Sequence, residues 1–195
     1  MLAVPMLTVP MLSVPMLTVP IRIRVAGDLP GCVDVLRRVH ERNGYPSRWP
    51  ADPAAWLAPE NEAGAWVAEH DGQIAGHVGL VRGMPRLHLP GYQPEDLGGI
   101  IRLFTDPAAR RHGMARELLD VATGCARDLG LQPVLDVVDD ATGAIALYER
   151  AGWRLAGAQP AWWTDPDGST PTIRIYLGPV APGSLSPGPR YPGSA

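Results

Sequence analysis

The sequence predicts an α/β domain in which a mixed sheet carries helices on both faces. Two segments, residues 100–129 and 133–152, each pass from a short apolar strand through a turn into an amphipathic helix. A third observation is a hairpin whose turn contains Asp71-Gly72, a dipeptide typical of tight β-turns. Because 46% of the 195 residues are hydrophobic, the chain can bury one substantial core, and we expect a single domain.

The elements before the hairpin are one strand and two helices. Residues 21–25 alternate apolar and charged side chains, which predicts a strand with one exposed face. Asp28 is suited to cap a following helix and Pro30 to its first turn, and residues 43–46 end that helix. Residues 52–57 begin a second, short helix.

The hairpin itself consists of residues 65–69 and 73–80, joined by the turn 70–72. Residues 82–98 are rich in Pro and Gly and are predicted to form a loop. The final strand of the sheet is predicted at residues 172–177.

The segment from residue 100 onward is the most informative part of the chain. Residues 100–105 are rich in β-branched and aromatic side chains and are followed by Asp106-Pro107, which predicts a strand. In the helix that follows, apolar residues recur at three- and four-residue spacing before Gly130 ends it. These apolar positions are Leu118, Ala122, Cys125, Ala126 and Leu129.

The turn between this strand and helix is suited to hold an anion. The first N–H groups of a helix have no partner within it, and the helix dipole is positive at that end. Gly113 and Ala115 would let a pyrophosphate approach the main chain, and Arg110 and Arg111 add positive charge. An ordinary connection with solvated arginines is the better explanation of this short motif when it is taken alone.

Two motifs occur in order, each in the expected strand or helix context. The first is Arg110-x-x-Gly113-x-Ala115. The second is Ala144-x-x-Leu147-Tyr148-x-x-x-Gly152-Trp153. Together they make the chain, over roughly residues 20–178, resemble the GNAT superfamily of acetyl-CoA-dependent N-acetyltransferases.

The resemblance implies a mostly antiparallel central sheet in which two splayed strands form the cleft for CoA. It implies acetyl-CoA as the acyl donor, bound by the strand before the turn and by the turn itself. The residues at these positions are Leu103, Phe104, Thr105, Arg110, Arg111, His112, Gly113, Met114, Ala115 and Arg116. Tyr148 occupies the position of the general acid, and a phenol with a pKa near 10 can protonate a thiolate whose conjugate acid has a pKa near 8.5.

The general base is left open by the sequence. Many family members carry a glutamate on the strand before the phosphate turn, but residues 100–105 contain no carboxylate. The proton could pass to one of several side chains elsewhere or, through water, to solvent. These side chains are His77, His88, Glu69 and Asp96. The missing carboxylate also keeps an alternative open, a non-catalytic acyl-CoA-binding or interaction module of the same fold.

The acceptor implied by the resemblance is a primary amine of a small molecule or a peptide, which attacks the thioester directly. In the family, residues 28–57 and their loops correspond to the region that covers the acceptor. Several aromatic side chains there and before the last strand either line a pocket or simply pack. They are Tyr45, Trp49, Trp56, Trp162 and Trp163. Homodimers are common in the family, but the sequence identifies neither the acceptor nor the oligomeric state.

Composition excludes several other functions. The net charge of −3 gives no electrostatic reason to expect a nucleic acid partner. Cys32 and Cys125 lack metal-ligand spacing, and the five histidines form no HExxH-like motif, so we expect no metal site. Two isolated cysteines suit a reducing compartment, and we expect a cytoplasmic protein.

Both ends of the chain are predicted to lie outside the acetyltransferase domain at residues 21–178. Residues 1–20 repeat an uncharged pentapeptide that ends in proline, and residues 179–195 are rich in Pro, Gly and Ser. Proline at every fifth position costs about 3 kcal/mol each in a helix interior, which favours an extended or disordered leader over a membrane span or export signal, and the tail is likewise predicted to be disordered. The methionines within the repeat are alternative starts, so the leader need not be translated. They are Met6, Met11 and Met16.

Overall fold

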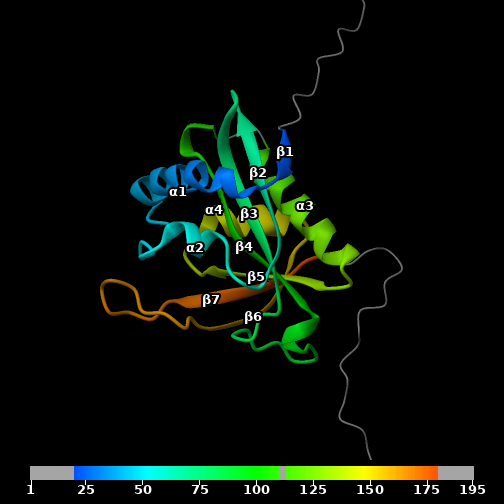
Figure 1. Ribbon diagram of the computed structural model, residues 1–195. Helices are drawn as coiled ribbons and strands as arrows, with labels where there is room; N and C mark the ends of the chain where they lie inside the picture. Colours follow the sequence, from blue (N-terminus) through cyan, green and yellow to red (C-terminus); the bar gives the residue numbers. More distant parts are fainter. Residues whose placement is uncertain (1–19, 110–112, 180–195) are drawn as a thin grey trace, which may run out of the picture.

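The computed structural model describes residues 20–109 and 113–179, which are built around one seven-stranded sheet (Figure 1). The strand order is β1-β2-β3-β4-β5-β7-β6, and every neighbouring pair is antiparallel except β4 and β5. The predicted mixed, mostly antiparallel sheet is therefore confirmed. In chain order the elements are β1 Ile21–Ile23, η1 Ala26–Asp28, α1 Leu29–Asn43, α2 Pro53–Leu57, β2 Glu62–His70, β3 Gln73–Arg82, η2 Pro94–Asp96, β4 Leu97–Thr105, η3 Pro107–Ala109, α3 Met114–Asp128, β5 Gln132–Val138, α4 Thr142–Arg150, β6 Arg154–Pro160 and β7 Thr172–Leu177.

The described residues cover the predicted domain and only the edges of its predicted flanks. Of the leader at residues 1–20 only Pro20 is described, and of the tail at residues 179–195 only Pro179. The turn residues 110–112 also lie outside the described part. The division into leader, domain and tail therefore stays a prediction.

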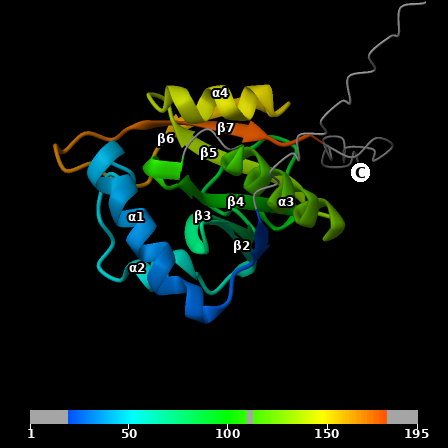
Figure 2. The same ribbon diagram turned by 90° about the horizontal axis from the view of Figure 1, so that it is seen from above.

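Helices α1 and α3 lie on opposite sides of β3 and β4, as Figure 2 shows. The alternation of side chains along β2 produces the two cores, because Val67 packs against α1 whereas Trp66 and Ala68 join the cluster of α3. Each helix contributes one apolar stripe, which confirms the predicted helical periodicity except at Leu129, which follows the end of α3 and is exposed. The fully buried members are Cys32, Val35 and Leu36 of α1 and Leu118, Leu119, Ala122 and Ala126 of α3.

The β2–β3 hairpin has the predicted turn. Asp71 and Gly72 both adopt left-handed backbone conformations, with φ of 51° and 71°. Two successive residues of this kind give a turn whose twist matches that of the flanking strands, and Asp-Gly is among the sequences that accept it most easily. The hairpin prediction is thus confirmed, together with its physical reason.

Strand β4 begins three residues before the predicted strand at 100–105, because it includes Gly98 and Gly99. Glycine is uncommon inside strands, which is why the sequence pattern places these residues in the loop. In the structure a Cβ at Gly98 would lie 3.0 Å from the Cβ of Ala126, and one at Gly99 would overlap the sulfur of Met84. The two glycines therefore allow the close approach of α3 on one face and of the 82–98 loop on the other.

Strand β6 is missing from the sequence prediction. It pairs with β7 at the edge of the sheet and runs Arg-Leu-Ala-Gly-Ala-Gln-Pro, without a single β-branched residue. An edge strand tolerates such a sequence because one of its sides makes no ladder, and its proline sits at the strand end. Its pairing with β7 is set by tertiary context, which local propensity does not report.

Two further features concern membranes and metals. Within the part of the chain that the structure describes, no helix has the length and apolar character needed to cross a membrane. In the same residues, His, Cys, Asp and Glu side chains form no group of three or more that could hold a metal ion. Cys32 is buried and Cys125 is half-buried, and both are free thiols.

Candidate active site

The hydrogen-bond ladder between the neighbouring strands β4 and β5 is interrupted, and the unpaired stretch is called the gap below. β4 and β5 pair in parallel only from Leu97 and Gln132 to Gly99 and Val134. Beyond these three residue pairs, β4 keeps its pairing with β3 and β5 keeps its pairing with β7, but the two strands no longer pair with each other. Residues 100–105 and 135–138 therefore each present one backbone edge without a strand partner. The predicted splayed pair of strands is confirmed.

A β-bulge lies in β4 beside this gap. His77 pairs with Phe104 and Gly79 with Ile101, so that one residue of β3 faces two residues, Arg102 and Leu103, of β4. Arg102 adopts a left-handed backbone conformation with φ of 53°, which is unfavourable for a residue with a side chain. Bulges of this kind redirect a side chain. Here the bulge turns Arg102 toward α2, where its guanidinium lies 4.6 Å from the centre of the Trp56 ring.

The imidazole of His77 holds this bulge. His77 is fully buried, and its ring stacks on Phe104 with the ring centres 5.3 Å apart. Arg24 Nη1 lies 2.9 Å from His77 Nε2, and because a guanidinium can only donate, Nε2 accepts. Nδ1 therefore carries the proton and donates to the Arg102 carbonyl oxygen at 3.0 Å. Burial lowers the pKa of His77 to about 4, so the ring is neutral at pH 7.

Arg24 is itself neutralised by a carboxylate. Its Nη2 donates to both oxygens of Glu62, at 2.8 and 2.9 Å, and its Nη1 also donates to the Leu57 carbonyl oxygen. The bidentate pair connects β2 to the segment that follows β1. His77, one of the four base candidates, is thus a buried neutral group that supports β4, and solvent does not reach it.

The predicted phosphate turn enters α3 through Gly113. This glycine has φ of 77° at the N-cap position, and its carbonyl oxygen accepts hydrogen bonds from the amides of Arg116 and Glu117. The earlier amides of the first turn have no acceptor within a helix, which leaves them available to an anion. Met114 is buried, whereas Arg116 is exposed and forms an ion pair with Asp120 at 2.7 Å. The predicted binding residues of this turn can therefore contribute main-chain groups regardless of side-chain type.

Replacing Gly113 by alanine is expected to lower stability by about 1–2 kcal/mol and to weaken acetyl-CoA binding, because L-residues disfavour this φ. A steric clash is not the reason, since the atom nearest to an added Cβ is Glu117 Oε1 at 3.7 Å. Gly124→Ala is the matched control: Gly124 lies inside the same helix with no atom within 4 Å of an added Cβ, and the change should stabilise by up to about 1 kcal/mol. Urea unfolding and calorimetric titration measure both effects. Equal behaviour of the two variants would contradict the role of φ at Gly113.

Tyr148 of α4 is buried beside the gap. Only 8% of the residue is exposed, and its ring packs against Trp153 and Tyr176 with centres 6.2 and 6.3 Å away. Its hydroxyl makes no hydrogen bond to any residue that the structure describes. Burial, reinforced by the negative charge of Asp136, raises the pKa of the phenol above its usual value of 10. The group is therefore protonated at neutral pH and can donate.

Asp136 of β5 is the carboxylate that the sequence analysis overlooked. It is the one charged residue of a mainly apolar strand, and burial raises its pKa from 3.8 to about 6. A desolvated carboxylate costs stability, so a charged residue in such a strand is a candidate for function, and this was the available signal. A carboxylate with a pKa near 6 is matched to proton transfer at neutral pH.

Tyr148 and Asp136 approach the gap from opposite faces of the sheet. Leu135 and Tyr176 belong to the same core cluster as Tyr148 and α3. Val134, two residues before Asp136, belongs to the cluster on the other face. Because side chains alternate along β5, Asp136 lies on the face of α1 and α2. An acid and a base thus reach the gap from the two sides of the sheet.

The pKa shifts of His77 and Asp136 predict opposite pH dependences of stability. Between pH 4 and 6.5 the unfolded chain binds a proton at His77 that the folded chain does not, so stability rises with pH. Between pH 3.8 and 6 the folded chain holds a proton at Asp136 that the unfolded chain lacks, so stability falls with pH. Each slope is about 1.4 kcal/mol per pH unit, and the two nearly cancel.

Asp136→Asn should therefore unmask the His77 slope. Stability of this variant should increase from pH 4 to 6 by roughly 2 kcal/mol relative to the wild type. Denaturant unfolding at half-unit pH steps measures the two curves. Parallel curves for variant and wild type would show that the pKa of Asp136 is not raised in the folded chain.

The other base candidates lie away from the gap. Glu69 forms an ion pair with Arg22 at 2.7 Å on the β1–β2 edge. Asp96 is exposed in η2, at the end of β4 opposite to the bulge, and His88 is exposed in the 82–98 loop. The structure brings none of these three next to Tyr148.

The aromatic side chains near α1 and α2 divide into two groups. Trp49 packs against His40 with ring centres 5.3 Å apart and lies under the Arg37 guanidinium, which is a structural role. Tyr45 and Trp56 contact each other edge to face at 6.3 Å on the side of the Arg102 guanidinium. Desolvation of its hydroxyl raises the pKa of Tyr45, and Tyr148, Arg102 and Asp136 all act on it electrostatically. Tyr45 thus lies among the groups of the gap although 38% of the residue is exposed.

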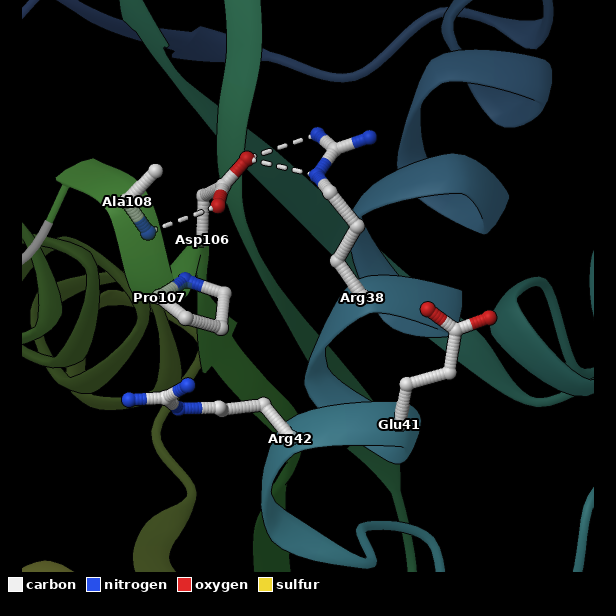
Figure 3. A pocket seen from close by; sticks show the side chains of 6 residues that line it. All are labelled: Arg38, Glu41, Arg42, Asp106, Pro107 and Ala108. Carbon is white, nitrogen blue, oxygen red and sulfur yellow. Dashed lines mark hydrogen bonds and ion pairs between the residues drawn. The ribbon is translucent and has the colours of Figure 1, made fainter.

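A separate hollow lies between α1 and the end of β4 (Figure 3). It has a volume of about 320 Å³ and is lined by Arg38, Glu41, Arg42, Asp106, Pro107 and Ala108. Asp106 accepts two hydrogen bonds from Arg38, at 2.6 and 2.9 Å, and one from the Ala108 amide. This hollow contains neither Tyr148 nor Asp136. Its ion pair instead fixes the segment that leads into the phosphate turn.

The fold and the placement of these groups define an acetyltransferase domain. Residues 32–153 match the model of the acetyltransferase (GNAT) family, and the chain belongs to this family. The predicted family, fold and enzyme class are thereby confirmed.

Among curated relatives, the chain is similar to mycothiol acetyltransferases of two bacteria. It is 32% identical to that of Cellulomonas flavigena over 168 residues, which are 80% of this chain and 48% of the relative. It is 39% identical to that of Geodermatophilus obscurus over 79 residues, which are 40% of this chain and 26% of the relative. The chain thus spans about half the length, or less, of these relatives.

Solved structures show the same fold at low identity. The ribosomal-protein-S18-alanine N-acetyltransferase of Escherichia coli superposes with a TM-score of 0.63 and 21% identity, covering 87% of this chain and 99% of that one. Arabidopsis thaliana NAA60, solved with a bisubstrate analogue, has a TM-score of 0.64 and 19% identity, covering 82% of this chain and 97% of that one.

Proposed function

We propose that this chain is an acetyl-CoA-dependent N-acetyltransferase that transfers an acetyl group to a primary amine of a small molecule or peptide by direct attack on the thioester. The observation that carries the proposal is the placement of the Tyr148 phenol and the Asp136 carboxylate on opposite faces of the sheet at the gap between β4 and β5. Acyl transfer to an amine needs one group of each kind.

The donor would occupy the open backbone edges and the start of α3. The main chain of Leu103, Phe104 and Thr105 would bind the pantetheine arm and polarise the thioester carbonyl. The turn that leads to Arg116 would hold the pyrophosphate. Family membership and an Arabidopsis NAA60 structure solved with acetyl-CoA support this placement. The proposed contacts of Arg110, Arg111 and His112 with the donor rest on the sequence motif alone.

The two side chains would then divide the proton transfers. The amine nitrogen attacks the thioester carbon, forming the C–N bond, and its proton passes to the Asp136 carboxylate directly or through water. As the C–S bond breaks, the Tyr148 hydroxyl donates its proton to the departing thiolate. A main-chain N–H aimed at the developing oxyanion contributes about 3–4 kcal/mol in comparable acyl-transfer sites. Solvent then restores both protonation states.

The relatives are consistent with either acceptor class, because their names specify mycothiol in one case and a protein alanine in the other. A non-catalytic module was favoured only by the absence of a carboxylate on β4. Asp136 on β5 supplies that carboxylate, so the catalytic function is the better supported of the two. Cytoplasmic location and homodimer formation stay predictions.

Calorimetric titration with acetyl-CoA and turnover with a panel of amines test the proposal. CoA release should be followed by mass spectrometry, because the free thiols Cys32 and Cys125 would react with a thiol reagent. The 17 basic residues are all arginine, so lysine autoacetylation cannot add to the background. Failure to bind acetyl-CoA would overturn the function, whereas binding without any turnover would support the non-catalytic module.

A further inference from the structure

One cation in the site, the half-buried Arg102, has no counterion among the described residues. Arg102 Nη1 is buried, yet it makes no hydrogen bond with any residue in the described ranges. The contact that the structure shows for this guanidinium is the face of the Trp56 ring at 4.6 Å. The nearby Arg24, in contrast, is paired, because its guanidinium hydrogen-bonds Glu62, His77 and the Leu57 carbonyl oxygen. Arg102 is thus charged, desolvated and unpaired.

The neighbouring acidic groups do not neutralise Arg102. Both oxygens of Glu62 are already bound by Arg24. Asp136 lies on the same face of the sheet but forms no ion pair with Arg102 among the described residues. Burial lowers the pKa of Arg102, which shows that the surroundings disfavour its charge. An unpaired buried charge of this kind is expected where a ligand supplies the opposite charge.

The position of Arg102 points to the acceptor as that ligand. The bulge aims the side chain to the face of α1 and α2, where Asp136 also lies, and Tyr45 is influenced by both of them. The phosphate turn belongs instead to α3, which packs on the other face. Arg102 is only half-buried as a residue, so its guanidinium stays within reach of a molecule in the gap.

We propose that Arg102 binds a carboxylate of the acceptor, so that the acceptor is an amino acid or a similar small amine with a free carboxylate. This inference rests on the proposed acetyltransferase function and names its substrate class. A planar guanidinium matches a carboxylate through two parallel hydrogen bonds, and stacking on Trp56 holds it in one orientation. With the carboxylate held there, the amine of a zwitterionic substrate faces Asp136.

The test compares amino acids with their own amides as acceptors. The pair differs only in the carboxylate, which also raises the pKa of the neighbouring amine and so leaves less of it neutral. Intrinsic reactivity therefore favours the amide, and a preference for the acid must come from the protein. For the best acceptor in a set of amino acids, kcat/KM should be at least about tenfold higher for the acid than for the amide.

Substitution of Arg102 tests whether this residue causes the preference for the amino acid over its amide. R102Q should lower kcat/KM for the acid by about 100-fold and change that for the amide by less than threefold, whereas R102K should retain part of the preference. R37Q is the matched control, because Arg37 also lies over a tryptophan but on the exposed side of α1. It should leave the acid-to-amide ratio unchanged.

A binding measurement gives a second readout that needs no turnover. In the presence of CoA, N-acetyl amino acids should bind the wild type at least about tenfold more tightly than their amides, and R102Q should lose this difference. R102Q should keep the acetyl-CoA affinity of the wild type, which shows that it is folded. If no acid is preferred in either assay, or if R102Q keeps the preference, the inference is overturned while acetyl-CoA binding leaves the proposed function standing.

Discussion

Replacing Tyr148 by phenylalanine is expected to lower kcat by about 100- to 1,000-fold, the usual contribution of a positioned general acid, without weakening acetyl-CoA binding. The phenol is buried, protonated and without a hydrogen-bond partner among the described residues, so its proton is available to the leaving thiolate. Removing one oxygen leaves the ring packing against Trp153 and Tyr176 intact. Single-turnover kinetics and calorimetric titration separate the two effects.

Tyr176→Phe provides the control for this prediction. Tyr176 is fully buried 6.3 Å from Tyr148, but its hydroxyl donates to Glu149 at 3.0 Å instead of reaching the gap. Its loss should change kcat by less than about threefold and lower stability by about 1 kcal/mol, the net worth of one hydrogen bond. If Tyr148→Phe kept the wild-type kcat, the assignment of the general acid would be wrong.

Replacing Asp136 by asparagine is expected to reduce kcat/KM by about 100-fold or more at pH 7. In the wild type, the carboxylate must be ionised to accept the amine proton, so kcat/KM, expressed per neutral amine, should rise as the pH passes about 6 and then level off. The variant should lack this rise, because an amide does not titrate. Initial rates from pH 5 to 8 with one acceptor measure both profiles.

The loss of kcat/KM expected for Asp136→Asn cannot be attributed to unfolding. Raised pKa values mark a carboxylate that destabilises the folded chain when ionised, so the variant should be more stable at pH 7 by roughly 2 kcal/mol. Asp96→Asn is the matched control, because Asp96 is exposed in η2 and was a base candidate from the sequence. It should retain both the rate and the pH profile. A wild-type-like profile in Asp136→Asn would exclude Asp136 as the base.

The sequence was sufficient for most of the fold, with the exception of β6. The two strand–turn–helix segments and the hairpin follow from local patterns, and each is present in the structure. Local patterns succeed there because hydrophobic periodicity and turn chemistry are decided within a few residues. Tyr148 lies on α4 as the helical pattern predicts, whereas its role as general acid follows from the family resemblance and stays a prediction.

The other side of the site depends on contacts between distant residues. The bulge that redirects Arg102 is held by His77, 25 residues away, and an arginine with positive φ has no recognisable sequence pattern. His77 was considered a base, but burial between Arg24 and the Arg102 carbonyl oxygen makes it a support. The sequence pattern failed to identify Asp136 for another reason. Its strand is apolar on average, and the pattern was interpreted for the strand as a whole and not residue by residue.

The short pairing between β4 and β5 has a mechanical consequence. Among the described residues, only three residue pairs of the β-ladder join the sub-sheet β1–β4 to the sub-sheet β5–β7, and the remaining contacts between them are made by helices, loops and side chains. A donor molecule lying along both free strand edges would act as an additional strand, stapling the two halves of the domain together. The donor-bound and donor-free forms would then differ in the cooperativity of unfolding more than in shape. Binding of the donor would also rigidify the β4–β5 junction, where the chemistry takes place.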